Sequence, residues 1–105
     1  MATEKSFVDF VTEQIQDAGI ISSRKMFGEY ALYSNGKVVA LICNNQVFVK
    51  PTQAGKTFIG EVNEAPAYPG AKNSFLIEEK IEDKEWFSEL IRLTEKELPM
   101  PKKKK

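Results

Sequence analysis

The fold is decided by residues 29–50, which read EYALYSNGKVVALICNNQVFVK. Three runs in this stretch are rich in β-branched and aromatic residues, namely 29–34, 37–43 and 46–50. The pairs between them are Asn35-Gly36 and Asn44-Asn45. Asn-Gly is the strongest short hairpin signal because both residues accept a positive φ, and Asn-Asn tolerates it too. We therefore predict a three-stranded antiparallel meander.

If both turns contain two residues, the register assigns each side chain of the meander to a face of the sheet. One face then holds Tyr30, Leu32, Val39, Leu41, Cys43, Phe48 and Lys50. The other holds Glu29, Ala31, Tyr33, Val38, Ala40, Ile42, Val47 and Val49. The middle run is apolar on both sides, whereas a sheet with one solvated face alternates. We therefore expect helices to cover one face and another segment or a second molecule to cover the other.

The sequence predicts one helix before this meander and one near the C-terminal end of the chain. An apolar stripe at steps of three and four predicts a first helix, and its members are Phe7, Phe10, Val11, Ile15 and Ala18. Ser6 is its predicted N-cap and Gly19 its stop. A last helix starts near Asp83 and carries a second stripe, which comprises Trp86, Phe87, Leu90, Ile91, Thr94 and Leu98.

The remaining segments are shorter. Residues 20–27 form a connection with room for a short strand, and residues 52–59 a short helix capped by Thr52 and stopped by Gly60. Residues 63–73 read as a loop and residues 74–79 as a further strand. The predicted fold class is α+β: an antiparallel sheet with a three-stranded meander, packed by N- and C-terminal helices in two layers. Residues 1–101 form one domain, and residues 102–105 a basic tail.

The composition limits the chemistry that the chain can perform. It has no histidine and one cysteine, Cys43, which excludes His-based triads, Cys–His dyads and His-containing zinc sites. Gly55-Lys56-Thr57 resembles the end of a phosphate-binding loop, but Lys50 stands where that loop needs a glycine. The acidic residues around Asp83 fit the solvated start of a helix. We predict no catalysis, no cofactor and no metal.

The charge distribution bears on which partners the protein can bind, and the lack of targeting signals bears on its location. The net charge is zero, but without the four lysines Lys102–Lys105 the chain carries 11 basic and 15 acidic residues, a net charge of −4. An acidic body repels nucleic acid, and a lysine tail is either a solubilising end or a basic patch. No leader and no run of about 20 apolar residues is visible, and a lone cysteine suits a reducing compartment. We expect a soluble, cytoplasmic protein.

Six residues are candidates for an interaction surface: Arg24, Lys25, Tyr30, Phe48, Lys50 and Tyr68. Arg24 could hold a carboxylate or phosphate, or tie its own loop to a nearby acid. Tyr30, Phe48 and Lys50 share a face in the expected register, so they could stack single-stranded bases or lie under the terminal helices. Tyr68, before Pro69, is either an exposed contact or a loop anchor.

One set of residues resembles a known family. It comprises Arg24–Tyr33 (RKMFGEYALY), Gly36-Lys37, Val39–Leu41, Phe48–Lys50 and Ala67–Gly70. These residues are similar to the TfoX N-terminal domain family, over roughly residues 8–98. The resemblance implies an α+β domain of bacterial origin without known catalysis. The competence regulators that give the family its name act with other transcription factors and carry a second, C-terminal domain. We expect this chain to be a stand-alone copy of the first.

Together these features favour a non-enzymatic regulatory module that works through protein contacts, with a homodimer as one form of that contact. The alternative is a nucleic-acid-binding protein that uses the lysine tail and a basic, aromatic sheet face. The missing catalytic residues and the apolar middle strand favour the first function, and the acidic body weighs against the second.

Overall fold

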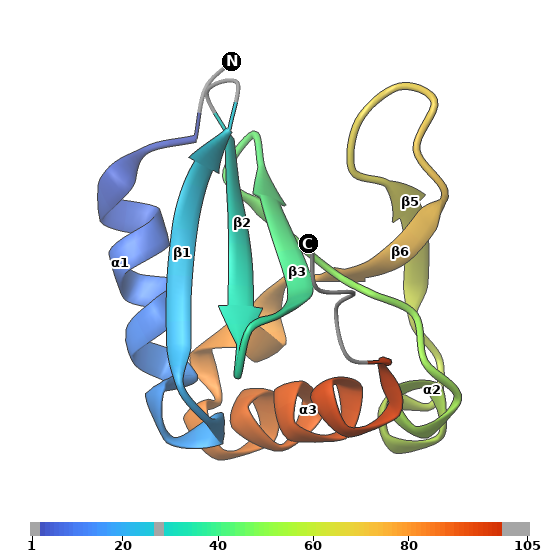
Figure 1. The fold of residues 1–105 in the computed structure, drawn as a ribbon. Coiled ribbons are helices and arrows are strands. Elements are labelled where there is room, and N and C mark those ends of the chain that lie inside the picture. The colour runs from blue at the N-terminus through green and yellow to red at the C-terminus, as the bar shows by residue number, and fades with distance from the viewer. Residues whose placement is uncertain (1–2, 27–28, 100–105) are drawn as a thin grey trace, which may run out of the picture.

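A six-stranded antiparallel sheet organises the chain, with strand order β1-β2-β3-β4-β6-β5 (Figure 1). The structure is a computed structural model that describes residues 3–26 and 29–99. The strands are β1 Ile21–Met26, β2 Glu29–Ser34, β3 Lys37–Cys43, β4 Gln46–Val49, β5 Asn63–Pro66 and β6 Asn73–Ile77. The helices are α1 Lys5–Gln14, α2 Gln53–Ile59 and α3 Lys84–Glu97, with 3-10 turns η1 Gln16–Ala18 and η2 Glu79–Glu82. The predicted α+β class is confirmed.

The two turns of the meander form as predicted. Asn35, Gly36, Asn44 and Asn45 have φ values of 53°, 84°, 55° and 58°. A positive φ at both central residues matches the right-handed twist of the flanking strands. Ser34 therefore pairs with Lys37, and Cys43 with Gln46.

The predicted register of the first hairpin holds next to the turn but is wrong from Leu32 toward the start of β2. A bulge between Leu32 and Tyr33 shifts the pairing, so that Leu32 lies opposite Ala40 and Tyr30 opposite Ile42. Val39 and Ala40 are both fully buried in the core that the helices cover, although they are consecutive. A bulge allows this because it inserts one extra residue and interrupts the alternation of side chains.

The helices cover one face of the sheet. Figure 1 shows α1 beside β1 and α3 across one end of the sheet. The core comprises Val8, Val11, Ile15, Leu32, Val39, Ala40, Ile42, Val47, Val49, Phe75, Ile77, Ile81, Phe87, Leu90 and Ile91. These residues come from α1 and its C-cap Ile15, from α3 and η2, and from strands β2, β3, β4 and β6, so helices and sheet share one hydrophobic core.

Of the two predicted N-caps, Thr52 is confirmed and Ser6 is wrong, and the last helix starts next to Asp83 as predicted. Thr52 accepts a hydrogen bond from Gly55 N at 3.0 Å, and Asp83 accepts one from Trp86 N at 3.2 Å. Ser6 does not cap α1, because the helix begins at Lys5 with Glu4 at the N-cap. The predicted first helix also continues past Gln14 as the 3-10 turn η1 before Gly19.

One other predicted segment needs correction, and two lie outside the described residues. Residues 63–66 form the edge strand β5, whereas the sequence predicted a loop, because pairing with β6 overrides the local turn signals. Phe27 and Gly28 of the family-like block lie outside the described residues. The tail Lys102–Lys105 lies outside them as well.

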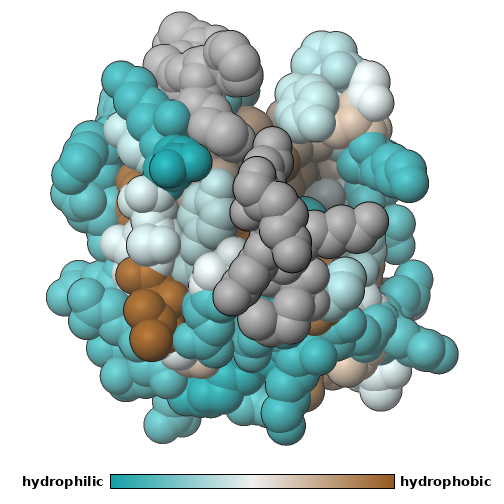
Figure 2. All heavy atoms as spheres, in the orientation of Figure 1, coloured by the Kyte–Doolittle hydropathy of each residue, from teal (hydrophilic) through white to brown (hydrophobic). Residues whose placement is uncertain are grey.

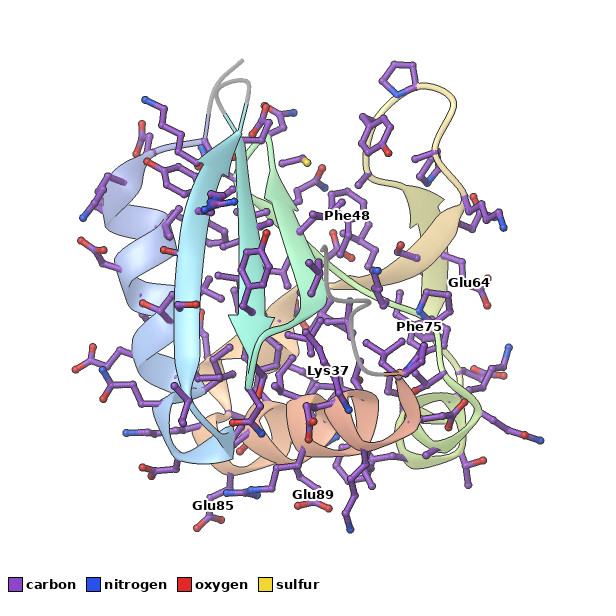
Figure 3. The ribbon with its side chains drawn as sticks, in the orientation of Figure 1. Lys37, Phe48, Glu64, Phe75, Glu85 and Glu89 are labelled. Atoms are coloured by element: carbon purple, nitrogen blue, oxygen red, sulfur yellow. The ribbon has the colours of Figure 1, made fainter. Side chains whose placement is uncertain are left out.

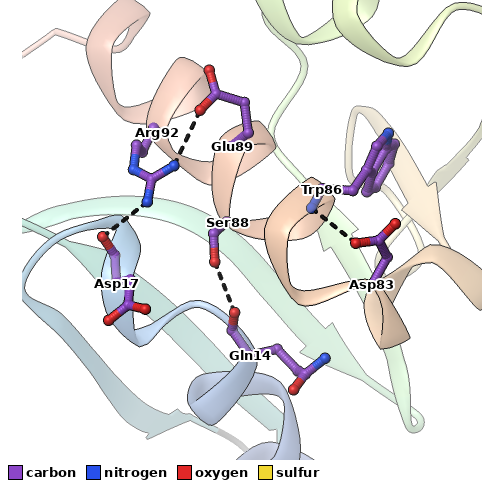
Figure 4. Close-up of polar contacts among 7 residues, drawn as sticks. All are labelled: Gln14, Asp17, Asp83, Trp86, Ser88, Glu89 and Arg92. Atoms are coloured by element: carbon purple, nitrogen blue, oxygen red, sulfur yellow. Dashed lines mark hydrogen bonds and ion pairs between the residues drawn. The ribbon is translucent and has the colours of Figure 1, made fainter.

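Helix α3 is fixed to the first part of the chain by polar contacts (Figure 4). Ser88 Oγ donates to the Gln14 carbonyl at 2.8 Å, and Arg92 Nη2 donates to the Asp17 carbonyl at 3.2 Å. On another side of the helix, Lys37 Nζ lies 2.9 Å from a Glu95 carboxylate oxygen (Figure 3 labels Lys37). Only 9% of the Lys37 side chain is exposed, so this ion pair joins β3 to α3 in a nearly dry position.

Glu95→Ala should destabilise the protein by about 2 kcal/mol, because it leaves the Lys37 ammonium nearly buried without its counter-charge. Lys37→Met should cost less, since the Glu95 carboxylate that it leaves behind is more exposed, at 19%, than the Lys37 ammonium at 9%. Urea unfolding measures both. Glu89→Ala is the control, because Glu89 forms an exposed pair with Arg92 that contributes little. Equal losses for Glu95→Ala and Glu89→Ala would contradict the assignment.

Gly55→Ala should also destabilise the protein, by about 1 kcal/mol, although alanine favours helix. A Cβ at Gly55 would lie 2.7 Å from Thr52 Oγ1 and 3.3 Å from Leu90 Cδ1, so it would displace the α2 cap and press on α3. Thr57→Ala, at an exposed position of α2, is the matched control and should be neutral or stabilising. A gain in urea midpoint for Gly55→Ala would show that the cap can move freely.

Candidate functional site

The described helices leave the other face of the sheet without a helix. Three buried apolar side chains lie outside the helix-covered core, namely Ala31, Cys43 and Phe48. Tyr33, Val38, Leu41 and Leu76 on the same face are half-buried. We call these seven residues the second face. The expectation that the middle strand is apolar on both sides is confirmed for β3.

A row of paired residues crosses the second face from edge to edge. Arg24 pairs with Ala31, Ala31 with Leu41, Leu41 with Phe48, Phe48 with Leu76, and Leu76 with Asn63. Cross-strand partners project from the same side of a sheet. The row is therefore apolar across its four central strands, with a cation at its β1 end and an amide at its β5 end.

The candidate residues do not gather on one surface. Tyr30 packs against the helix-covered core, whereas Phe48 lies on the second face, 4% exposed, between β3 and β6 (Figure 3). The expected shared face of Tyr30 and Phe48 is therefore wrong, and the cause is the bulge at Leu32. Arg24 is exposed at the end of the row, and Lys25, beside it on β1, pairs with Tyr30 on the helix side.

The other two candidates lie at the margins. Lys50 is exposed one residue past β4, and Tyr68 is 56% exposed in the connection between β5 and β6. The large apolar side chain with the greatest exposure among the described residues is Ile20, at 79%. Figure 2 shows a small, strongly hydrophobic patch at the lower left of a largely hydrophilic surface.

A polar cluster at the β3–β4 turn was not foreseen from the sequence. Glu29 accepts hydrogen bonds from the Thr3 hydroxyl and, at 3.0 Å, from Asn44 N. Asn45 N donates to Thr3 Oγ1 at 3.3 Å, and Glu4 N donates to Asn45 Oδ1 at 2.9 Å. This Glu29 cluster fastens the residues before α1 to the turn. Its partners are more than 14 residues apart, so no local pattern signals it.

The Glu29 cluster has an electrostatic consequence. Burial acts to raise the pKa of Glu29, but the hydrogen bonds from Thr3 and Asn44 outweigh it, and the pKa lies below its ordinary value of 4.5. A lowered pKa in the folded state means that the ionised carboxylate stabilises the fold. That contribution is fully present above about pH 4.5 and is lost as the pH falls through the folded pKa.

Glu29→Gln should therefore lower the free energy of unfolding at neutral pH, and the difference from wild type should shrink below about pH 4.5. Urea unfolding across the acid range measures it. Glu13→Gln, at an exposed position of α1 for which no such cluster exists, is the control. A difference for Glu29→Gln that is independent of pH would mean that the carboxylate's charge plays no part.

The residues that the structure describes contain no group of three or more histidine, cysteine, aspartate or glutamate side chains placed to hold a metal. Burial raises the pKa of the Cys43 thiol, and the nearby Glu29 carboxylate raises it further. A protonated, buried thiol is a poor nucleophile. Among the described helices, none is long and apolar enough to cross a membrane.

Comparison with known proteins identifies the family. The model of the TfoX N-terminal domain matches residues 13–98, which is most of the chain. The chain belongs to the TfoX N-terminal domain family. The resemblance seen in the Arg24–Tyr33 block is thereby confirmed.

The chain is also 39% identical, over 105 residues, to a protein of Spirochaeta aurantia described as an uncharacterized 12.7 kDa protein in the trpE 5′ region. That alignment covers the whole chain and 91% of the relative. The matched residues include all six strands, α2 and α3, and begin within α1.

Proposed function

We propose that this TfoX N-terminal domain is a non-enzymatic regulatory module that works through protein contacts, and that a second copy of the chain covers its second face. The observation that carries the proposal is the apolar row Ala31–Leu41–Phe48–Leu76, over which the described chain places no helix. Ala31 and Phe48 are buried within the domain, so the apolar surface that this face offers a partner is that of the half-buried Tyr33, Val38, Leu41 and Leu76.

The chemistry of the row favours a second copy. A two-fold symmetric contact uses the same surface patch on both subunits. An apolar row can therefore pack against the apolar row of a second copy and needs no charged partner. The one charged side chain in the row, Arg24, stands at its β1 end, where a polar rim belongs. Sheets that pack face to face with interleaved side chains form an ordinary protein core.

The same geometry weakens the nucleic-acid alternative. Base stacking needs exposed aromatic rings beside basic groups. Phe48 is almost fully buried, and Tyr30 lies on the helix side of the sheet. Neither the Phe48 ring nor the Tyr30 ring is therefore available beside Arg24 and Lys50 for a base to stack on.

Leu41→Glu should convert the protein from dimer to monomer, because it places a carboxylate in the middle of the contact without disturbing the helix-covered core. Size-exclusion chromatography with light scattering measures the mass, and far-UV circular dichroism checks the fold. Val38→Glu is a second variant on the same face and should have the same effect. Ile20→Glu, which replaces an exposed apolar residue outside the second face, should leave the dimer intact.

Wild type that stays monomeric at the highest concentration it reaches would overturn the dimer. Dissociation by Ile20→Glu but not by Leu41→Glu would place the contact elsewhere. Fluorescence anisotropy with duplex and single-stranded oligonucleotides covers the alternative. Binding that falls steeply with salt and with deletion of residues 102–105 would put nucleic acid in place of the protein partner.

A further inference from the structure

A groove lies at the β5 end of the molecule, where α2, the β5–β6 pair, η2 and the start of α3 meet. Its volume is about 540 Å³, within the range of ligand sites. Ile59, Val62 and Trp86 supply apolar surface. Three carboxylates, Glu61, Glu78 and Glu79, and one ammonium group, Lys80, also line it. The groove therefore combines an aromatic wall with a negative net charge.

Packing holds the aromatic wall in place. The ring of Trp86 lies 5.4 Å, centroid to centroid, from the ring of Phe58 on α2, and the backbone N–H of Trp86 is bound by the Asp83 cap. Figure 4 shows Trp86 in the first turn of α3, with its ring directed away from Arg92. A ring that is fixed in this way binds without a further loss of conformational freedom.

The face of Trp86 already holds a cation. Lys80 Nζ lies 5.6 Å from the ring centroid, within the range of a cation–π contact. Lys80 is exposed on the short turn η2, so little is needed to move its flexible side chain aside. This intramolecular contact shows which chemistry the wall accepts, a positive charge with carboxylates around it.

We propose that this groove binds an arginine side chain carried by an extended segment of a partner protein, and that Lys80 occupies the site in the free domain. A guanidinium group stacks flat on an indole ring and donates hydrogen bonds from its edge to a carboxylate, so it fits this lining better than an ammonium does. The nearby Glu61, Glu78 and Glu79 supply the complementary charge.

The sheet edge favours a polypeptide as the source of the guanidinium. Within the described chain β5 pairs only with β6, so its outer edge is free. Asn63 begins β5 and also lines the groove. A segment that adds to this edge by main-chain hydrogen bonds brings its side chains past the groove. A free amine or guanidine lacks that main-chain contribution.

The full chain should be titrated with the peptide acetyl-Leu-Arg-Leu-Arg-Leu-amide, and with the same peptide in which citrulline, a neutral isostere, replaces arginine. Trp86 is the only tryptophan, so its fluorescence and its single indole N–H resonance report on this groove alone. The arginine peptide should bind at least about fivefold more tightly than the citrulline peptide. It should also bind more tightly than acetyl-arginine amide, which tests the contribution of the backbone.

Two substitutions test the site with opposite signs. Lys80→Ala should tighten binding about two- to fivefold, because it removes the competing cation from the ring. Glu79→Gln should weaken binding. Lys72→Ala and Glu82→Gln are matched controls outside the groove, and both should bind as wild type does. Leu41→Glu should also bind as wild type, because Leu41 does not line the groove.

Equal binding of the arginine and citrulline peptides would overturn the proposal. Unchanged or weaker binding by Lys80→Ala would overturn the role of Lys80 as the resident cation. Acetyl-arginine amide that binds as tightly as the peptide would replace the polypeptide source by a small guanidinium ligand.

Discussion

The whole structure depends on β3 having apolar side chains toward both faces of the sheet. Val39, Ala40 and Ile42 are fully buried on the helix side, while Leu41 belongs to the second face. A strand of this kind needs apolar cover over both faces of the sheet. The neighbours β2 and β4 are held against it by two-residue turns, and the remaining elements are arranged around these three strands.

The bulge in the first hairpin increases the number of β3 side chains that pack against the helices. It turns both Val39 and Ala40 toward the helix-covered core, where strict alternation would place only one of them. It also leaves Lys37 on that side, and the ammonium group is accommodated by the Glu95 carboxylate of α3. The gain in apolar burial is thus coupled to one nearly buried ion pair, whose desolvation offsets part of it.

Local chemistry explains which features could be predicted from the sequence. The turns at Asn35-Gly36 and Asn44-Asn45, the caps Thr52 and Asp83, and the stripe of α3 each depend on residues within a few positions of one another. The bulge, the pairing of β5 with β6 and the Glu29 cluster depend on residues far apart in sequence. A one-residue shift moves every later side chain to the opposite face, which is why Tyr30 was assigned wrongly while Phe48 kept its partner Leu41.

The candidate surfaces differ in how far the sequence could reveal them. The second face follows from the composition of β3, since an apolar run with no polar alternation already implies a second covered side. The arginine groove has no such pattern, because Ile59, Glu79 and Trp86 come from three separate elements. Only the fold brings them together, and only the fold shows that Lys80 reaches the indole. One surface is apolar and self-complementary and the other is aromatic and acidic, and the two meet at Leu76 and Asn63, which belong to the row and also line the groove.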